Sequence, residues 1–159
     1  MAGDAANETA LAALIPIANS NSAYSDIPGS GYYATSMTNL DMTGNQHNAA
    51  MALVDWDLNG CSGASSSACI TPSGTISLSQ GYTANYIINR LCTTAGDPNA
   101  SGNSCATYQP TSNNSPKKGE LTYGDNKRFT PSPTGYYRMT SRVHGPKDTY
   151  SFIEAIIHF

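Results

Sequence analysis

Residues Tyr136 to Phe159, YYRMTSRVHGPKDTYSFIEAIIHF, decide the fold of this chain. The stretch has two alternating arms, joined at Gly145 to Asp148 by a short turn sequence that contains Gly-Pro. One side of the first arm carries Tyr137, Met139, Ser141 and Val143, and the other carries Tyr136, Arg138, Thr140 and Arg142. Because a period of two residues is typical of a half-buried strand, the stretch predicts a closing β-hairpin.

The second arm of this hairpin is partly apolar on both sides. Ile153, Ala155, Ile157 and Phe159 alternate with Tyr150, Phe152, Glu154, Ile156 and His158. A strand with two apolar faces is typical of a position between other strands. We therefore expect this strand inside the sheet rather than at its edge.

One helix is predicted, over residues Asp4 to Ile15. Asp4 is the expected N-cap, and Pro16 is expected to end the helix. The predicted apolar stripe consists of Ala10, Leu11, Leu14 and Ile15. A helix of this length is marginal by itself, so we expect its stripe to pack on the sheet.

The other segments predict strands separated by long loops. Strands are expected at 75–78 and 82–92, with a short strand or helical turn at 49–54. Residues 20–60 are otherwise predicted as loop, and so are residues 95–118. The fold class is therefore α+β: one N-terminal helix packed on an antiparallel sheet of about four strands, with long disulfide-bearing loops.

Length and composition limit the class of protein. The chain of 159 residues predicts a single domain, 1–159, with a helix end at 1–16, a connector at 17–74, and the sheet and its loops at 75–159. Only 12% of the residues are charged, which suits an exported protein. A net charge of −3 gives no basic surface for a phosphate backbone, so nucleic-acid binding is not expected.

The four cysteines predict disulfides rather than a metal site. They allow three connectivities, and the short loops between neighbours favour Cys61–Cys69 and Cys92–Cys105. They form no CxxC motif, and zinc would need closely spaced thiolates or histidines. Disulfides indicate an oxidising compartment, such as the periplasm or the cell exterior.

Several segments resemble one protein family. The hairpin, quoted from Gly135 as GYYRMTSRVHGPKDTYSFIEAIIHF, resembles the C-terminal hairpin of the PilX family of minor type IV pilins. Residues 31–33, 39–45 and 85–92, with the later Cys105, are similar to family segments in the same order. Together these segments cover about half of the chain.

The resemblance implies a place and a role. Pilins of this type begin with a processed leader and a long hydrophobic helix, which anchors them in the inner membrane and later in the fibre core. The resemblance implies that this anchor precedes residues 4–15 in the native protein and is missing here, since no apolar run is long enough to span a bilayer. It also implies a soluble globular domain that faces the periplasm before assembly and belongs to the extracellular pilus afterwards.

By the same resemblance the chain is a minor type IV pilin that takes part in pilus assembly at the fibre tip, with a further role in adhesion or aggregation. The implied partners are other minor pilins, the major pilin and the assembly machinery. One alternative is a type II secretion pseudopilin, which shares the helix and sheet. Another is a secreted carbohydrate-binding or adhesin domain, which the Ser, Thr and Asn content and the tyrosine doublets 32–33 and 136–137 favour.

One motif bears on metal binding. Residues 55–60, DWDLNG, match the opening of a calcium-binding loop, with Asp55, Asp57 and Asn59 as the candidate ligands. The twelfth position is Ser66, where such a loop needs a bidentate Glu. Asp125-Asn126 could supply ligands from elsewhere. An acidic turn ahead of a disulfide is the preferred interpretation, so no metal is predicted.

Motifs for catalysis are absent from the sequence. There is no GxSxG elbow, HExxH, P-loop or dinucleotide fingerprint, and paired cysteines leave no thiol nucleophile. The histidines, which lie far apart, are His47, His144 and His158. Nothing fixes the separation of Glu120 and Glu154, on which carboxylate chemistry depends. The chain is predicted to be no enzyme, without catalytic residues or cofactors.

Overall fold

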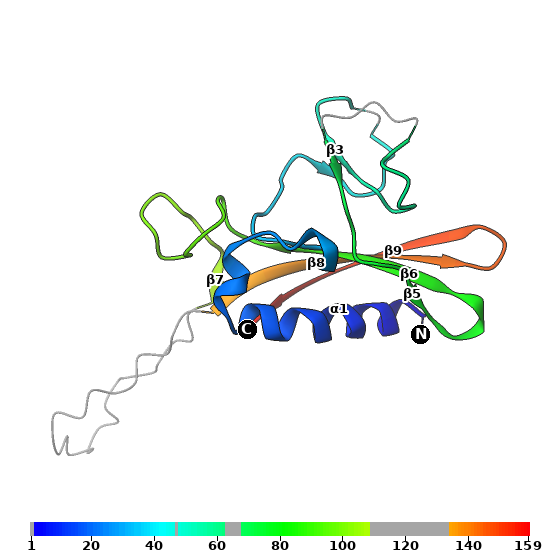
Figure 1. Ribbon diagram of the computed structural model, residues 1–159, viewed down its shortest axis with the longest axis horizontal. Coiled ribbons are helices and arrows are strands. Elements are labelled where there is room, and N and C mark those ends of the chain that lie inside the picture. Colours follow the sequence, from blue (N-terminus) through cyan, green and yellow to red (C-terminus); the bar gives the residue numbers. More distant parts are fainter. Residues whose placement is uncertain (1, 47, 63–67, 109–133) are drawn as a thin grey trace, which may run out of the picture.

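The computed structural model describes residues 2–46, 48–62, 68–108 and 134–159. In chain order its elements are α1 (Ala2–Ala18), η1 (Asn21–Tyr24), η2 (Pro28–Ser30), β1 (Tyr32–Tyr33), β2 (Leu40–Asp41), β3 (Ala52–Val54), β4 (Cys69–Ile70), β5 (Ile76–Ser77), η3 (Ser79–Gly81), β6 (Thr83–Arg90), β7 (Thr107–Tyr108), β8 (Thr134–Gly145) and β9 (Thr149–His158). The described part has three layers: α1, a main sheet, and a small sheet made of β2, β3 and β4 (Figure 1).

The main sheet is built on the antiparallel strands β6, β8 and β9. Met139 of β8 pairs with Ile88 of β6 on one side and with Ala155 of β9 on the other. The short strands β5 and β7 also pair antiparallel, whereas β1 runs parallel to β6. The predicted fold class is confirmed, because one N-terminal helix packs against a mainly antiparallel sheet. The hairpin β8–β9 and the strands near 76 and 86 are also where the sequence predicts them.

Helix α1 lies along one face of the main sheet (Figure 1). Its buried residues are Ala6, Ala10, Leu14 and Ile17. They pack on Tyr86, Ile88, Tyr137 and Met139 of the sheet, and Ala6 packs on Ala84 and Val143. On β8 the helix-facing residues are therefore the alternate set that the two-residue period predicts.

The predicted helix boundaries and stripe need correction. The helix begins at Ala2, which puts Asp4 in its first turn instead of at the N-cap, and it continues through Pro16 to Ala18. Pro16 removes one helical hydrogen bond, but the burial of Ile17 and the bond from Asn19 N–H to the Ile15 carbonyl hold the last turn. The buried stripe passes from Leu14 to Ile17. Ile15, which the sequence places in the stripe, is therefore on another side of the helix and is 44% exposed.

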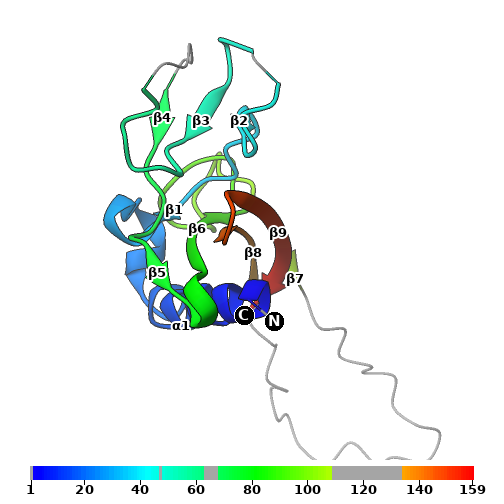
Figure 2. The same cartoon turned by 90° about the vertical axis from the view of Figure 1, so that its right-hand side faces the viewer.

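The small sheet covers the opposite face of the main sheet. Its strands run parallel, in the order β2–β3–β4. A second core lies between the two sheets and consists of Tyr33, Leu40, Ala52, Val54, Trp56 and Ile87. Strand β6 is therefore buried on both faces, with Ile88 towards α1 and Ile87 towards the small sheet, and Figure 2 shows α1 and β2–β4 on opposite sides of β6.

In the described part of the chain β9 lies at the edge of the sheet, which contradicts its predicted interior position. Among the described residues it pairs only with β8. On its outer face Phe152 is 38% exposed and Ile156 is 59% exposed. Phe152 has a partner other than a neighbouring strand, because it packs against the ring of Trp56 from the loop that follows β3.

Residues 17–74, expected as a connector, contribute to both sheets. They contain β1, which joins the main sheet, and all three strands of the small sheet. The short strand or helical turn expected at 49–54 is a strand, β3. No helix in the described part of the chain combines the length and the hydropathy that crossing a membrane requires.

Candidate binding site between the small sheet and the hairpin

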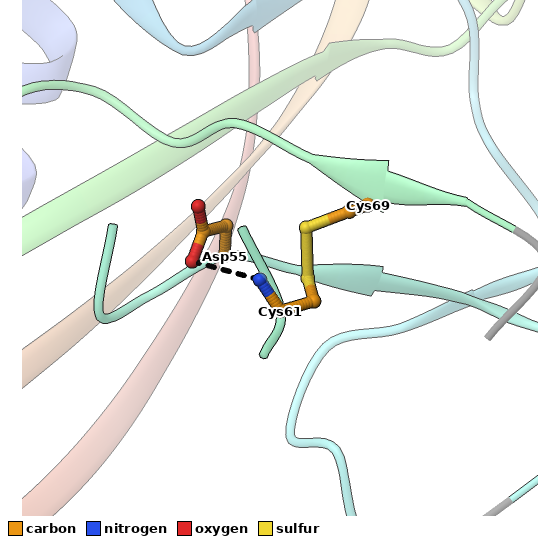
Figure 3. A group of neighbouring side chains, drawn as sticks. All are labelled: Asp55, Cys61 and Cys69. Atoms are coloured by element: carbon orange, nitrogen blue, oxygen red, sulfur yellow. Dashed lines mark hydrogen bonds between the residues drawn. A yellow bond between two sulfur atoms is a disulfide. The ribbon is translucent and has the colours of Figure 1, made fainter. Parts of the chain in front are cut away.

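Strand β3 ends at a tight loop organised by Asp55. The Asp55 carboxylate accepts hydrogen bonds from the backbone N–H groups of Asn59 and Gly60, both at 2.8 Å, and of Cys61 at 3.4 Å (Figure 3). Burial alone would raise the pKa of Asp55, but these bonds favour the charged form and bring the pKa below its usual value. The side chain therefore fixes the loop as a charged acceptor.

Strand β2 ends in a second loop of the same kind. The Asp41 carboxylate accepts hydrogen bonds from the backbone N–H groups of Thr43 at 3.2 Å, Gly44 at 2.9 Å and Gln46 at 2.9 Å. Burial of Asp41 opposes its charge, yet the hydrogen bonds outweigh burial and lower its pKa. Two adjacent parallel strands thus end in loops closed by a buried carboxylate.

The calcium candidates do not direct their oxygens to one point. Asp55 bonds its own loop, Asp57 Oδ1 pairs with Arg142 at 2.6 Å, and Asn59 Oδ1 accepts from Ser62 N–H at 3.1 Å. A calcium ion would have to displace these bonds, because it needs six to eight oxygen ligands in one shell. Ser66, Asp125 and Asn126 lie outside the described residues.

Asp55 also lies beside a disulfide. Cys61 and Cys69 are bonded and tie this loop to β4 (Figure 3), and Cys92 is bonded to Cys105, the pairs that the loop lengths favour. The ligand atoms of Asp55, Cys61 and Cys69 lie within 4.8 Å of one another. Because a disulfide sulfur is no thiolate, this group lacks the ligands of a metal centre.

A pocket of about 430 Å³ opens between these loops and the hairpin. Among its lining residues is Arg142, whose guanidinium donates to the Trp56 carbonyl at 2.7 Å and lies 5.8 Å from the Trp56 ring and 4.9 Å from the Tyr150 ring. The Phe152 ring meets Trp56 edge to face at 5.8 Å. The arrangement offers aromatic faces next to a paired guanidinium and carboxylate.

Sequence reasoning finds only part of this pocket. It singles out Asp57 and Asn59 as calcium candidates and puts Arg142 on the side of its strand opposite Met139, but it gives Trp56 and Phe152 no role. A usable signal would have been the only tryptophan of the chain, set inside the acidic motif. The partner of that motif is 85 positions away at Arg142, and no local pattern reveals this distance.

A second pocket lies at the other end of the sheet, near the end of α1. It is lined by Arg90, which is only 3% exposed and donates to the carbonyls of Ala34 at 3.2 Å and Gly96 at 2.7 Å. Burial raises the pKa of Tyr137 at the same pocket. These contacts tie β6 to neighbouring loops, and the carbonyls already engage the guanidinium.

The remaining candidates from the sequence are scattered. His144 pairs with Asp148 at 3.1 Å and stacks on Tyr150, while His158 stacks on Tyr108 at the opposite end of β9. Glu154 lies between them on the exposed face of β9. His47 and Glu120 are outside the described residues.

Known proteins give no independent indication of family. Comparisons with family models, with curated proteins and with solved structures found no match. The structure alone therefore establishes an α+β domain in which an N-terminal helix packs on a mixed sheet with two disulfides.

Proposed function

We propose that this chain is the globular domain of a minor type IV pilin, a non-enzymatic subunit that takes part in pilus assembly at the fibre tip. The observation that carries the proposal is the packing of α1, whose buried stripe lies along β6 and β8 of the main sheet. By the resemblance described above, α1 is the end of the long pilin helix. The proposed anchor would then be the part of that helix that precedes α1.

The outer side of α1 also supports this role. Ile15 is an apolar residue that α1 presents away from the core, with 44% of its surface exposed. In a fibre whose centre is a bundle of helices, such a residue packs against the helix of a neighbouring subunit. One side of α1 would thus pack on the sheet of its own domain, and the other side would pack on a neighbouring subunit.

The segments that carry the resemblance meet in space. Tyr32 and Tyr33 form β1, which pairs with Ile88 and Asn89 of β6. Residues 39–45 contain β2 and most of the Asp41 loop, which belongs to the layer on the same sheet. Their proximity supports one shared fold rather than separate chance similarities.

The proposed partners are sibling minor pilins, the major pilin and the inner-membrane assembly machinery. The two disulfides support a location outside the cytoplasm. Before assembly the domain would face the periplasm from its anchor in the inner membrane, and afterwards it would belong to the extracellular pilus.

The test is to delete the full-length gene in its bacterium and count surface pili by electron microscopy. The proposal expects loss of pili, and recovery of pili when retraction is also blocked, since a priming subunit favours assembly over retraction. A complementing gene with Ile15→Glu should fail to restore pili, whereas one with Thr9→Glu, at an exposed polar position of α1, should restore them. Unchanged pilus numbers in the deletion strain would refute the role in assembly.

Two other functions fit the same fold. A type II secretion pseudopilin would have the same helix and sheet, and the neighbouring genes would reveal it. A secreted carbohydrate-binding or adhesin domain is favoured by the aromatic pocket at Arg142. A leader and a hydrophobic helix encoded upstream of α1 would exclude the secreted domain.

A further inference from the structure

We propose that the pocket between the small sheet and the hairpin binds a neutral saccharide, with the exposed rings of Tyr150 and Phe152 as its apolar wall and the Arg142–Asp57 pair as the hydrogen-bonding group. This proposal goes beyond pilus assembly and holds whether or not the domain enters a fibre. The pocket volume of about 430 Å³ lies within the range of small-molecule sites.

The aromatic wall of the pocket is accessible from solvent. Tyr150 is 49% exposed and Phe152 is 38% exposed, and both line the pocket. They are alternate residues of β9, so they project from the same face of the strand. His144 stacks on Tyr150 and the Arg142 guanidinium lies over the same ring, so the apolar surface offered to a ligand is the exposed remainder of the two rings, against which the C–H groups of a pyranose ring can pack.

The polar group beside this wall carries both charges. The Arg142 side chain is 12% exposed and its guanidinium pairs with Asp57, whose side chain is 59% exposed. Guanidinium N–H groups only donate hydrogen bonds and a carboxylate only accepts them, so together they match hydroxyl groups, which do both. Since the two charges compensate each other, the pair favours a neutral ligand over an anion.

The rim adds amide side chains to this set. Asn45 comes from the segment that follows Asp41 and Asn59 from the Asp55 loop, and both are exposed residues that line the pocket. An amide group donates and accepts hydrogen bonds, as a sugar hydroxyl does. A peptide partner would more often be held by backbone bonds along a strand edge or by a wider apolar surface.

The floor of the pocket is held in place before any ligand binds. Trp56 is 7% exposed, and its indole Nε1–H donates to the Met42 carbonyl at 2.8 Å. Asp55 closes the adjacent loop, which the Cys61–Cys69 disulfide ties to β4. Little conformational freedom is then lost on binding, which favours the weak contacts that a neutral sugar can make.

The experiment uses the whole chain of 159 residues and an array of immobilised glycans. The array presents neutral hexose and N-acetylhexosamine termini, sialylated termini as the anionic comparison, and a tyrosine-rich peptide. A glycan that binds is then titrated in solution as its methyl glycoside. The reporter is the fluorescence of Trp56, the only tryptophan, which lines the pocket.

The chain offers a closely matched control. Tyr150 stacks on His144 at 4.6 Å, and Tyr108, which is 43% exposed and not among the lining residues, stacks on His158 at 4.7 Å. We expect Tyr150→Ala to raise the Kd about tenfold and Tyr108→Ala to leave it within about twofold. Asp57→Asn keeps the shape of the side chain and leaves the aromatic residues unchanged. It should also weaken binding, because it removes the carboxylate that accepts hydrogen bonds from the ligand.

Each other outcome overturns the proposal. Binding of no glycan refutes it, and so does binding of sialylated glycans or of the peptide alone. Equal losses in Tyr150→Ala and Tyr108→Ala would place the contact elsewhere on the surface. Because pilus counts are not used, failure here leaves the proposed role in assembly untouched.

Discussion

Replacing Gly31 by alanine tests how closely the backbone of residues 17–74 packs against the main sheet. Gly31 has a φ of +69°, and a Cβ built there would lie 2.6 Å from both the Ser73 nitrogen and the Tyr86 oxygen. These two atoms are joined by a backbone hydrogen bond of 2.8 Å, and Ile88 N–H donates to the Gly31 carbonyl at the same distance. An added methyl group would therefore push against backbone that cannot move independently.

The expected loss of stability has two parts. A left-handed conformation costs an L-residue about 1–2 kcal/mol, and overpacking a close contact costs about 1–3 kcal/mol. Gly31→Ala should then lower the free energy of unfolding by about 2–5 kcal/mol, a large share of the roughly 5–15 kcal/mol of a typical domain. Gly81→Ala is the control, because Gly81 has a φ of +78° and a Cβ added there would meet nothing within 4 Å, so only the first part applies.

The assay is urea denaturation of both variants, and unfolding is monitored by circular dichroism and by Trp56 fluorescence. With a slope of about 1–3 kcal/mol per molar urea, the difference between the variants should shift the midpoint by about 1 M. Equal losses in the two variants, or a loss under about 1 kcal/mol for Gly31→Ala, would refute the close approach of these segments.

Three further predictions concern stability and are checked by the same denaturation assay. Leu14→Ala should cost about 2–5 kcal/mol because Leu14 is fully buried, and Leu11→Ala should cost less because that side chain is only partly buried; equal costs would contradict the position of the helical stripe. The lowered pKa of Asp55 means that its charge stabilises the fold above the usual carboxyl pKa of about 3.9 and that this contribution is lost as the pH falls through the folded-state pKa. Asp55→Asn should therefore be less stable at pH 7 and lose less stability than the wild type between pH 7 and pH 3, and an unchanged pH dependence would argue against the Asp55 loop. Replacing Cys92 and Cys105 together by serine should cost about 3 kcal/mol for a sequence separation of 13, whereas a negligible cost would show that the bridge does not constrain the unfolded chain.

The hairpin was predictable because its pattern is local. Alternation over β8 separates Tyr137 and Met139 from Arg138 and Arg142, and the Gly-Pro sequence marks the turn; the structure shows that the first two residues face the helix. The edge position of β9 was not predictable, because an apolar outer face has two explanations. Phe152 could contact another strand or, as it does, a ring from a distant loop.

The small sheet and the pocket depend on contacts that are remote in sequence. Strands β2, β3 and β4 have two or three residues each, too few for a period to appear. Their positions follow from the loops at Asp41 and Asp55 and from the core around Trp56. The DWDLNG motif was visible, but its nearest chemical partner, Arg142, comes from the closing hairpin.

The most direct test of the account is to locate this chain on the bacterium that encodes it. Antibodies against the domain, applied to intact cells and detected with gold particles in the electron microscope, should label the tips of pili in the wild type and no structure in the deletion strain. Labelling at the tips would support a minor pilin that takes part in assembly there. Gold on the cell surface or on secreted material, with none on pili of a strain that makes them in normal number, would contradict the central claim.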